Sequence, residues 1–319
     1  MDEINRGPAG GGHGQLKKRF DAIVERIGDV VLGKGTQVEL ALTCLFARGH
    51  LLIEDLPGIG KTTLAKVLAR TLGLGFRRVQ FTSDMLPGDV LGTSVFEQKR
   101  SVFVFHPGPI FTQVLLADEI NRATPKTQSA LLEAMEENQV TIEGKTRFLD
   151  DPFFVIATQN PLEQIGTFPL PESQLDRFLM SIDLGYPGRE GEKRLLQKGG
   201  AAERLSSVTA ALSRDDVLRI QKAVSRVNAS DALLEYLQDI LEFTRGGPYF
   251  HMGLSPRAGL ALLQASRSWS FLHGRAHVIP EDLQAVFPWV VGHRLRRKSD
   301  LRVVPRSRLM ELLSEIPVP

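Results

Sequence analysis

Short apolar runs alternate with helical apolar patterns along the chain as far as residue 184. Between the runs, apolar residues recur at the three- and four-residue spacing of a helix, as at Leu64, Leu68 and Leu72. Strands that are apolar throughout and are joined by helices are typical of a parallel sheet covered on both faces. The pattern therefore predicts an α/β fold with a five-stranded parallel sheet. Its strands are expected at residues 51–53, 79–81, 114–117, 153–157 and 181–184.

Two segments interrupt this alternation with a different pattern. Residues 94–96 and 102–105 are strand-like runs on either side of a polar turn at 98–100. Residues 139–149 repeat the arrangement around a second turn at 143–145. Two strand-like runs joined by a short polar turn are typical of a β-hairpin. We expect both hairpins to be insertions beside the main sheet.

Strand patterns stop near residue 188, and the rest of the chain predicts helices alone. Residues that start helices precede or open the amphipathic segments of this part. These start signals are Ser213, Ser230, Ser255 and Pro280. At the other end, the first residues are rich in glycine and lack large apolar side chains. We therefore expect a flexible tail at 1–15, an α/β domain at 16–187 and an all-helical domain at 188–319.

Composition narrows the class of protein. Hydrophobic residues make up 42% and charged residues 24%, which is ordinary for a soluble globular protein. The formal net charge is only +2, so we do not expect nucleic acid as a partner. Cys44 is the only cysteine and excludes an intrachain disulfide. No apolar run approaches the roughly 20 residues of a membrane span, and the amino terminus has no signal-peptide pattern. We expect a cytoplasmic location without membrane insertion.

A glycine-rich turn follows the first apolar strand and leads directly into a helix. Such a turn gathers backbone N–H groups around one point, where the helix dipole also favours an anion. Lys61 would contact the β- and γ-phosphates of ATP, and the Thr62 hydroxyl would ligate Mg²⁺. The predicted nucleotide-binding residues of this turn, the phosphate loop, are Pro57, Gly58, Ile59, Gly60, Lys61, Thr62 and Thr63.

Asp55 departs from the usual pattern of such loops, which has glycine at its position. One interpretation is that Asp55 adopts the backbone geometry that glycine supplies, since aspartate tolerates positive φ better than most residues. The other is that its carboxylate lies near the phosphates and weakens nucleotide binding. The second interpretation predicts a slow or regulated ATPase, and both stay open at this point.

Two carboxylates end the third apolar strand, downstream of the phosphate loop. Asp118 is placed to hold the metal's water shell beside Thr62, and Glu119 to polarise the attacking water. The strand at 153–157 also ends in polar residues, at the carboxyl edge where open α/β sheets bind ligands. Asn160 in this segment is placed to orient the same water. Together these residues predict hydrolysis of ATP with Mg²⁺.

Several segments closely resemble MoxR-type AAA+ ATPases, and the resemblance covers roughly residues 16–295. Besides the phosphate loop, the matching segments are LADEINRA at 116–123, PKTQ at 125–128, LLEAME at 131–136, ATQNP at 157–161, PLPE at 169–172, QLDRF at 174–178 and LSPRA at 254–258. The resemblance implies an AAA+ P-loop core followed by a small four-helix lid. It also implies a ring, usually hexameric, and it matches the two hairpins to the helix-2 insert and the pre-sensor hairpin.

The resemblance further implies roles for single residues. Asn160 matches sensor 1 and Arg257 the sensor 2 arginine, which contacts nucleotide. Arg177 matches the arginine finger that reaches a neighbouring subunit's nucleotide, and a guanidinium suits γ-phosphate oxygens because it stays charged and offers forked donors. Arg122 is a second candidate for an intersubunit contact. The segment Val31, Leu32 and Gly33 lies where AAA+ proteins wall the adenine, although packing in the core explains it equally well.

Two functions follow from these residues. The first is a Mg²⁺-dependent ATPase whose ring remodels or matures protein clients, and the resemblance points to a von Willebrand factor A-domain protein as partner. The alternative is a nucleotide-gated binding or scaffold module with slow or no hydrolysis, for which Asp55 is the support. A DNA-translocating motor is disfavoured, since we see no DNA-reading domain after the predicted lid.

Overall fold

The computed structural model describes residues 13–160, 166–198 and 201–318. Most of the predicted tail lies outside these ranges, and helix α1 (His13–Gly28) begins within its last residues. No helix of the described ranges is long and apolar enough to cross a membrane.

The centre of the molecule is a five-stranded sheet in which all neighbouring strands are parallel. Its strands are β1 (Leu51–Glu54), β2 (Phe76–Gln80), β5 (Val114–Asp118), β8 (Phe154–Gln159) and β9 (Met180–Ile182), in the order β2-β5-β8-β1-β9. The predicted five-stranded α/β fold is confirmed. Strand β1 lies between β8 and β9, so the loop that follows it emerges near the middle of the sheet.

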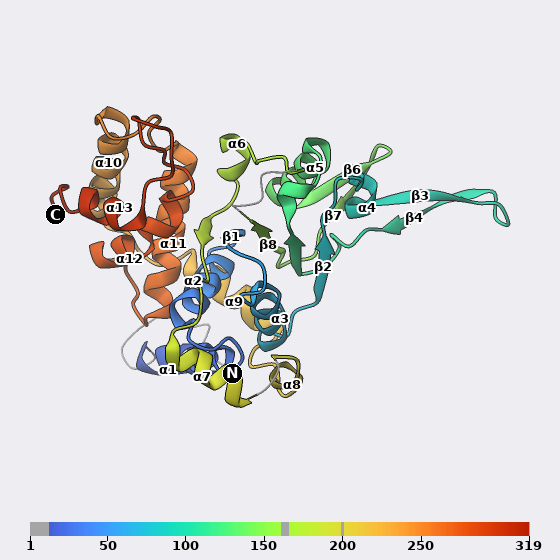
Figure 1. The fold of residues 1–319 in the computed structure, drawn as a ribbon, viewed down its shortest axis with the longest axis horizontal. Helices are drawn as coiled ribbons and strands as arrows, with labels where there is room; N and C mark the ends of the chain where they lie inside the picture. Colours follow the sequence, from blue (N-terminus) through green and yellow to red (C-terminus); the bar gives the residue numbers. More distant parts are fainter. Residues whose placement is uncertain (1–12, 161–165, 199–200, 319) are drawn as a thin grey trace.

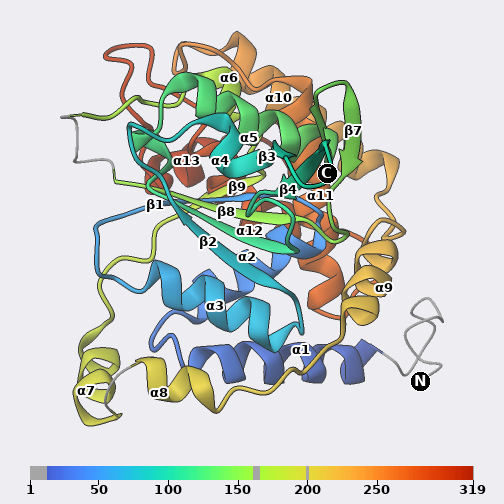
Figure 2. The same cartoon turned by 90° about the vertical axis from the view of Figure 1, so that its right-hand side faces the viewer.

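Helices cover both faces of this sheet (Figure 2). Helices α1, α2 (Gly35–Phe46) and α3 (Lys61–Thr71) lie on one face, and α4 (Pro87–Leu91) and α5 (Pro125–Glu137) lie on the other. Neighbouring residues of one strand point to opposite faces. Leu51 and Ile53 accordingly belong to the core beside α1, α2 and α3, whereas Leu52 belongs to the core beside α5. Burial on both faces explains why these strands are apolar throughout.

Both predicted hairpins are present outside the main sheet. Strands β3 (Gly92–Glu97) and β4 (Val102–Pro107) pair in an antiparallel register and project from the body of the molecule (Figure 1). Strands β6 (Gln139–Ile142) and β7 (Lys145–Phe148) form the second hairpin. The Arg147 guanidinium lies 3.8 Å from the centroid of the Phe105 ring, so the two hairpins contact each other.

Beyond β9 the described residues form helices, with a few isolated β-bridges and no strand. Ser213, Ser230 and Ser255 each accept a hydrogen bond from a backbone N–H in the first turn of the helix that follows, which confirms these predicted helix starts. The helices are α7 (Arg189–Lys198), α8 (Ala201–Ser206), α9 (Arg214–Val224), α10 (Asp231–Gly246), α11 (Pro256–Leu272), α12 (Pro280–Val291) and α13 (Arg306–Leu313). Helices α9 and α11 pack on α2, and α12 packs on β9. The domain boundary at residue 188 stays a prediction.

Candidate active site

The phosphate loop joins β1 to α3 and has the backbone that an anion site requires. Gly58 and Gly60 have φ of +83° and +99°, in the left-handed region that favours glycine. A Cβ atom added to either glycine would meet no described atom within 4 Å, so the space above the loop is open. Gly60 is the N-cap of α3, whose first N–H groups have no acceptor within the helix. The loop can therefore present several N–H groups to phosphate oxygens.

Lys61 is the first residue of α3, and its side chain folds back over the loop. Its Nζ donates to the carbonyl oxygen of Asp55 at 2.6 Å and to that of Leu56 at 2.9 Å. Lys61 is buried, with 9% of its surface exposed. These carbonyls hold the positive charge inside the curve of the loop, where a bound phosphate would need it.

Asp55 does not stand in for glycine in the way that one interpretation expected. Its φ is not positive, and its carboxylate points away from the loop. Oδ2 accepts the N–H of Leu184 at 2.7 Å and of Gly185 at 2.5 Å, and Oδ1 accepts the N–H of Leu56 at 2.8 Å. The expectation of a left-handed Asp55 is therefore wrong. The carboxylate accepts hydrogen bonds from three backbone N–H groups and points away from the loop. The structure therefore gives no support to the alternative in which the carboxylate lies near the phosphates and weakens nucleotide binding.

Asp118 ends β5 and is 7% exposed. Its Oδ1 accepts the hydroxyl of Thr158 at 2.6 Å, and its Oδ2 accepts Arg78 Nη2 at 2.7 Å. Both carboxylate oxygens are thus oriented by residues of the neighbouring strands β8 and β2. Mg²⁺ in nucleotide sites is typically held by one or two protein oxygens, water and phosphate. The pair Asp118 and Thr62 fits this small donor set, and the described residues include no cluster of three or more His, Cys, Asp or Glu that would indicate a protein-only metal site.

Glu119 is held by contacts on both its backbone and its carboxylate. It adopts a left-handed conformation with φ of 58° and ψ of 49°, and its N–H donates to the Thr158 hydroxyl at 2.9 Å. Its Oε2 accepts Gln80 Nε2 at 2.8 Å and pairs with Arg122 Nε at 2.9 Å. Arg122, expected as an intersubunit contact, therefore lies beside the predicted base of its own chain.

Arg78 and Gln80, which contact the acidic pair, were missed by sequence reasoning, and Thr158 was placed only among the polar residues that end the strand at 153–157, without a role of its own. The strand pattern carried a partial signal for them. Parallel neighbours of the third apolar strand end at the same edge of the sheet, and Gln80 is the register partner of Asp118. Thr158 follows Ala157, the partner of Ala117. Polar residues at the ends of both neighbouring strands could have been assigned to the site once the strand order was known.

The other candidates near the loop lie at the same edge or beside it. Asn160 is half-buried and directly follows β8, which pairs with β1 and β5. In the predicted adenine segment Val31 and Leu32 are buried, and Gly33 has φ of +73°. A Cβ atom on Gly191 would lie 3.5 Å from the Leu32 carbonyl oxygen, so this segment runs beside the start of α7.

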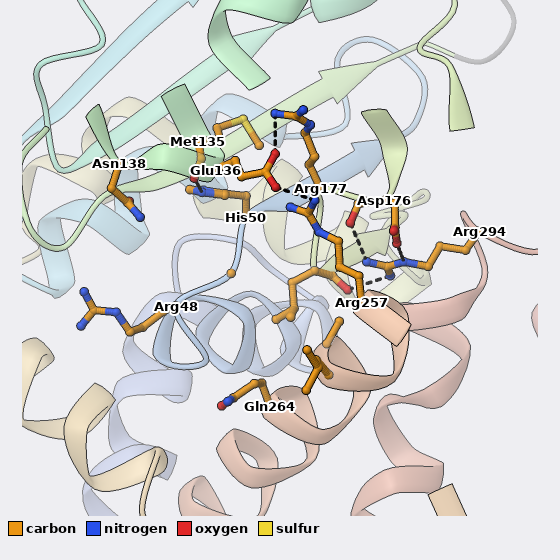
Figure 3. A pocket seen from close by; sticks show the side chains of 14 residues that line it. Arg48, His50, Met135, Glu136, Asn138, Asp176, Arg177, Arg257, Gln264 and Arg294 are labelled. Atoms are coloured by element: carbon orange, nitrogen blue, oxygen red, sulfur yellow. Dashed lines mark hydrogen bonds and ion pairs between the residues drawn. The ribbon is translucent and has the colours of Figure 1, made fainter. Parts of the chain in front are cut away.

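Arg177 and Arg257 lie together at a different edge of the molecule, which we call the arginine edge (Figure 3). Arg177 follows the short helix α6 (Glu172–Leu175), and Arg257 lies in the first turn of α11. Arg177 Nη1 is 2.8 Å from Glu136 Oε2, and Arg257 Nη1 is 2.9 Å from Glu136 Oε1. One carboxylate at the end of α5 thus holds both guanidinium groups.

These two arginines line a pocket of about 280 Å³ that contains no residue of the phosphate loop or the acidic pair. Its other charged lining residues are Arg48, Glu136, Asp176 and Arg294. Arg294 Nε donates to Asp176 Oδ1 at 2.6 Å, and Ser255 Oγ donates to Asp176 Oδ2 at 3.0 Å. Burial lowers the pKa of Arg294, whereas Asp176 raises it. The pocket is a cationic surface built from both the α/β part and the helical part of the chain.

His106 is exposed near the end of β4, where its register partner is Thr93. It lies outside both groups of residues described above. Cys44 is fully buried in α2, and burial raises the pKa of its thiol. A buried protonated thiol packs as a small hydrophobic side chain.

Family models match a part of the α/β region and a part of the helical region of the chain. A model described as "ATPase family associated with various cellular activities (AAA)" matches residues 50–180, which contain the phosphate loop, the acidic pair and Arg177. A model described as "AAA lid domain" matches residues 242–311, which contain Arg257.

Whole-chain relatives extend this similarity. The uncharacterized protein YeaC of Bacillus subtilis is 43% identical over 299 residues, covering 93% of each chain. Chaperone MoxR1 of Mycobacterium tuberculosis is 39% identical over 299 residues, covering 90% of this chain and 79% of its own. The crystal structure of a candidate ATPase from Cytophaga hutchinsonii superposes with a TM-score of 0.85 at 34% identity, covering 96% of each chain. With the AAA core, the lid and MoxR relatives along nearly its whole length, this chain belongs to the MoxR family of AAA+ ATPases.

Proposed function

We propose that this chain hydrolyses ATP with Mg²⁺ in a hexameric ring in which each site combines residues of two subunits. The observation that carries the proposal is the separation of the two groups of residues. The phosphate loop and acidic pair form one group, whereas Arg177 and Arg257 share Glu136 in a pocket that none of the first group lines. A neighbouring subunit that places its arginine edge against the loop would complete the site.

The residues of one chain would bind the nucleotide and the metal and activate the attacking water. Lys61 and the N–H groups of the loop bind the phosphates, and Thr62 and Asp118 hold Mg²⁺, which neutralises charge on the phosphate oxygens when bound. Glu119 accepts a proton from the attacking water, which Asn160 orients. Thr158 contacts both Asp118 and the Glu119 backbone, so it fixes the metal-binding and base residues relative to each other.

The arginines would act on the neighbour's nucleotide. Arg177 and Arg257 already point to one oxygen pair, that of Glu136, and carboxylate and phosphate oxygens are recognised by the same guanidinium donors. In the ring, the γ-phosphate of the adjacent subunit would take the position of that carboxylate. The charge that develops on the transferred phosphoryl group is then stabilised in trans.

For the ring's wider role, we propose remodelling or maturation of protein clients in the cytoplasm. A relative that is 39% identical is named a chaperone, and this supports action on proteins. A von Willebrand factor A-domain protein is the partner we would test first. The scaffold alternative rested on Asp55, whose carboxylate is engaged by backbone N–H groups of Leu56, Leu184 and Gly185, so we do not pursue it.

Glu119→Gln is the direct test of hydrolysis. The amide keeps the size of the side chain but cannot accept the water's proton, so we expect turnover to fall by about 100-fold or more. Affinity for a fluorescent ATP analogue should stay within about threefold of the parent. Glu133→Gln, on an exposed position of α5, serves as the control and should hydrolyse ATP at the parent rate. Undiminished phosphate release by Glu119→Gln would refute the assigned base, and absence of release by the parent in its assembled form would refute the ATPase proposal.

A further inference from the structure

The segment that leads from β9 to α7, residues 183–188, is bound by the nucleotide-contacting parts of the chain. We call it the β9–α7 linker. Asp55 Oδ2 accepts the N–H of Leu184 and of Gly185, at 2.7 and 2.5 Å. Lys34 Nζ donates to the carbonyl oxygen of Tyr186 at 2.6 Å. Three consecutive residues of the linker are thus held through their backbone by two side chains of opposite charge.

Asp55 and Lys34 lie directly beside the two segments expected to hold ATP. Asp55 opens the phosphate loop, and Lys34 directly follows the adenine segment 31–33 and is the N-cap of α2. Both side chains are buried, with exposed fractions of 9% and 6%. Burial lowers the pKa of the Lys34 ammonium, and the negative charge of Asp55 opposes this shift. The two charges therefore support each other as well as the linker.

A buried carboxylate is costly unless its oxygens are satisfied, so the contacts of Asp55 are specific rather than incidental. Gly185 has φ of +61°, a left-handed turn of the kind that lets successive N–H groups converge on one anion. Replacing Asp55 by glycine would leave the Leu184 and Gly185 N–H groups without this acceptor in a buried setting. The glycine common in other phosphate loops could not hold the linker in this way.

The backbone of Asp55 makes the contact that connects the linker to the phosphates. Its carbonyl oxygen accepts Lys61 Nζ at 2.6 Å, while its carboxylate accepts the linker N–H groups. A phosphate that draws the Lys61 ammonium toward itself would weaken the contact with the Asp55 carbonyl. The same residue would then transmit the change to Leu184 and Gly185.

We propose that Asp55 is a positioning residue of the phosphate loop that, together with Lys34, couples nucleotide occupancy to the β9–α7 linker and so to the helices beyond it. The inference rests on ATP binding at the loop, which is part of the proposed function, but it does not require hydrolysis. Asp55 thereby strengthens nucleotide binding, because the linker holds the entry of the loop in place. Through the linker, Asp55 also connects the helical part of the chain to the phosphate loop, so that nucleotide binding at the loop changes the contacts of that part.

Hydrogen–deuterium exchange of the full chain, with and without a non-hydrolysable ATP analogue, tests the coupling. In the parent, we expect the analogue to change exchange of the Leu184 and Gly185 amides by threefold or more. In Asp55→Gly, these amides should exchange at least tenfold faster without nucleotide and should no longer respond to it. We expect the KM for ATP to rise about tenfold while kcat at saturation changes less than threefold. Asp183→Asn, a linker carboxylate that pairs with Arg306 rather than the loop, is the matched control and should behave as the parent.

Asp55→Asn and Lys34→Met keep the test decisive if the glycine variant does not fold. The asparagine retains one oxygen for the linker but loses the charge, so it should give an intermediate exchange rate, and Lys34→Met should speed exchange near Tyr186. Unchanged linker exchange in all the folded variants would overturn the proposal. Tighter nucleotide binding by Asp55→Gly would overturn it as well, in favour of a weakening role for the carboxylate. A parent that binds the analogue and shows the linker response without hydrolysing ATP would refute the ATPase function and leave this coupling standing.

Discussion

The phosphate-loop site and the arginine edge both pair their charged side chains within one chain, but the signs of the charges are opposite. At the loop site, acidic side chains are neutralised by arginines of their own chain: Arg78 pairs with Asp118, and Arg122 pairs with Glu119. At the arginine edge, two guanidinium groups share the single carboxylate of Glu136, which neutralises only one of the two positive charges. Each region therefore contains, within one chain, substitutes for the charges that nucleotide, metal or a second subunit would supply.

The difference lies in how tightly these internal pairs are held. The side chains of Arg177 and Glu136 are 27% and 37% exposed, and pairs with such exposure are individually weak. Arg294, in contrast, is 6% exposed and donates to Asp176 and to several backbone carbonyls. We therefore propose that phosphate can replace Glu136 at Arg177 and Arg257 at modest cost, whereas the buried Arg294 pair holds the wall of the pocket in place.

Among the substitutions that affect only one of the two regions, Arg177→Ala should cause the largest loss of ATP turnover. Loss of an arginine supplied in trans lowers turnover by about 1,000-fold or more in related phosphoryl-transfer sites. We expect this fall with ATP affinity within threefold of the parent, because the loop site is intact. Phosphate release and fluorescent-nucleotide binding, both measured at protein concentrations that allow assembly, give the two quantities. Arg308→Ala, which removes an exposed pair with Glu311, is the control and should retain parent turnover.

Mixing two inactive variants sharpens the same point. An Arg177→Ala subunit keeps its Glu119, and a Glu119→Gln subunit keeps its arginine edge. If the site is shared, a mixture of both should regain a measurable part of the parent rate, since some interfaces pair an intact loop with an intact edge. A mixture that stays as inactive as its components, although the subunits assemble, would show that Arg177 does not act across the interface.

Glu136→Ala should have a smaller effect, on the arginine edge alone. Without the shared carboxylate, Arg177 and Arg257 repel each other, so their donors are less well placed for a phosphate. We expect turnover to fall about tenfold, equivalent to about 1.4 kcal/mol in the barrier, with unchanged ATP affinity. Glu137→Ala at the next, exposed position of α5 is the matched control. A rise in turnover would instead mean that breaking the Glu136 pairs costs more than the earlier placement of the two arginines gains when phosphate replaces the carboxylate.

The sequence predicted the loop region better than the arginine edge, and the reason is physical. Strand alternation, glycine spacing and capping serines are local, so residues 51–63 and the starts of α9, α10 and α11 could be assigned from neighbours in the chain. The contact of Asp55 with Leu184 joins residues 129 positions apart. It depends on where the linker passes after β9, which no local pattern encodes.

The same limit applies to Arg257. Its position beside Arg177 depends on how α11 docks against the end of α5, and motif matching supplied its role without that placement. Arg78 and Gln80 were missed for a related reason, since their contacts with the acidic pair follow from β2 being the neighbour of β5. Motifs identified the residues proposed to act on ATP, whereas the fold was needed to find the residues that contact them and hold them in place.

The smallest expected effect that concerns the arginine edge alone is a loss of stability at low pH, through His50, which lines the pocket at this edge. Its Nδ1 accepts the Val155 N–H at 3.0 Å, so its Nε2 carries the proton that is donated to the Met135 carbonyl at 3.1 Å. Burial lowers the pKa of His50 to about 4, the Met135 contact opposes the shift, and the Arg257 charge adds to it. His50 thus joins β8 to the end of α5, one residue before Glu136, only while its ring is neutral.

The sign of the pH effect follows from this lowered pKa. The unfolded chain protonates His50 near its ordinary value of 6.5 and the folded chain near 4, so the contribution to stability is complete above pH 6.5 and is lost as pH falls toward 4. At pH 5.5 the free energy of unfolding should already be lower by about 1.4 kcal/mol from this residue. In His50→Gln, denaturant unfolding at pH 7.5 and 5.5 should show a pH difference smaller by that amount, whereas His106→Gln, at an exposed position of β4, should match the parent. An equal pH difference in His50→Gln and the parent would place the acid sensitivity at another group, for instance at His293, whose pKa burial also lowers.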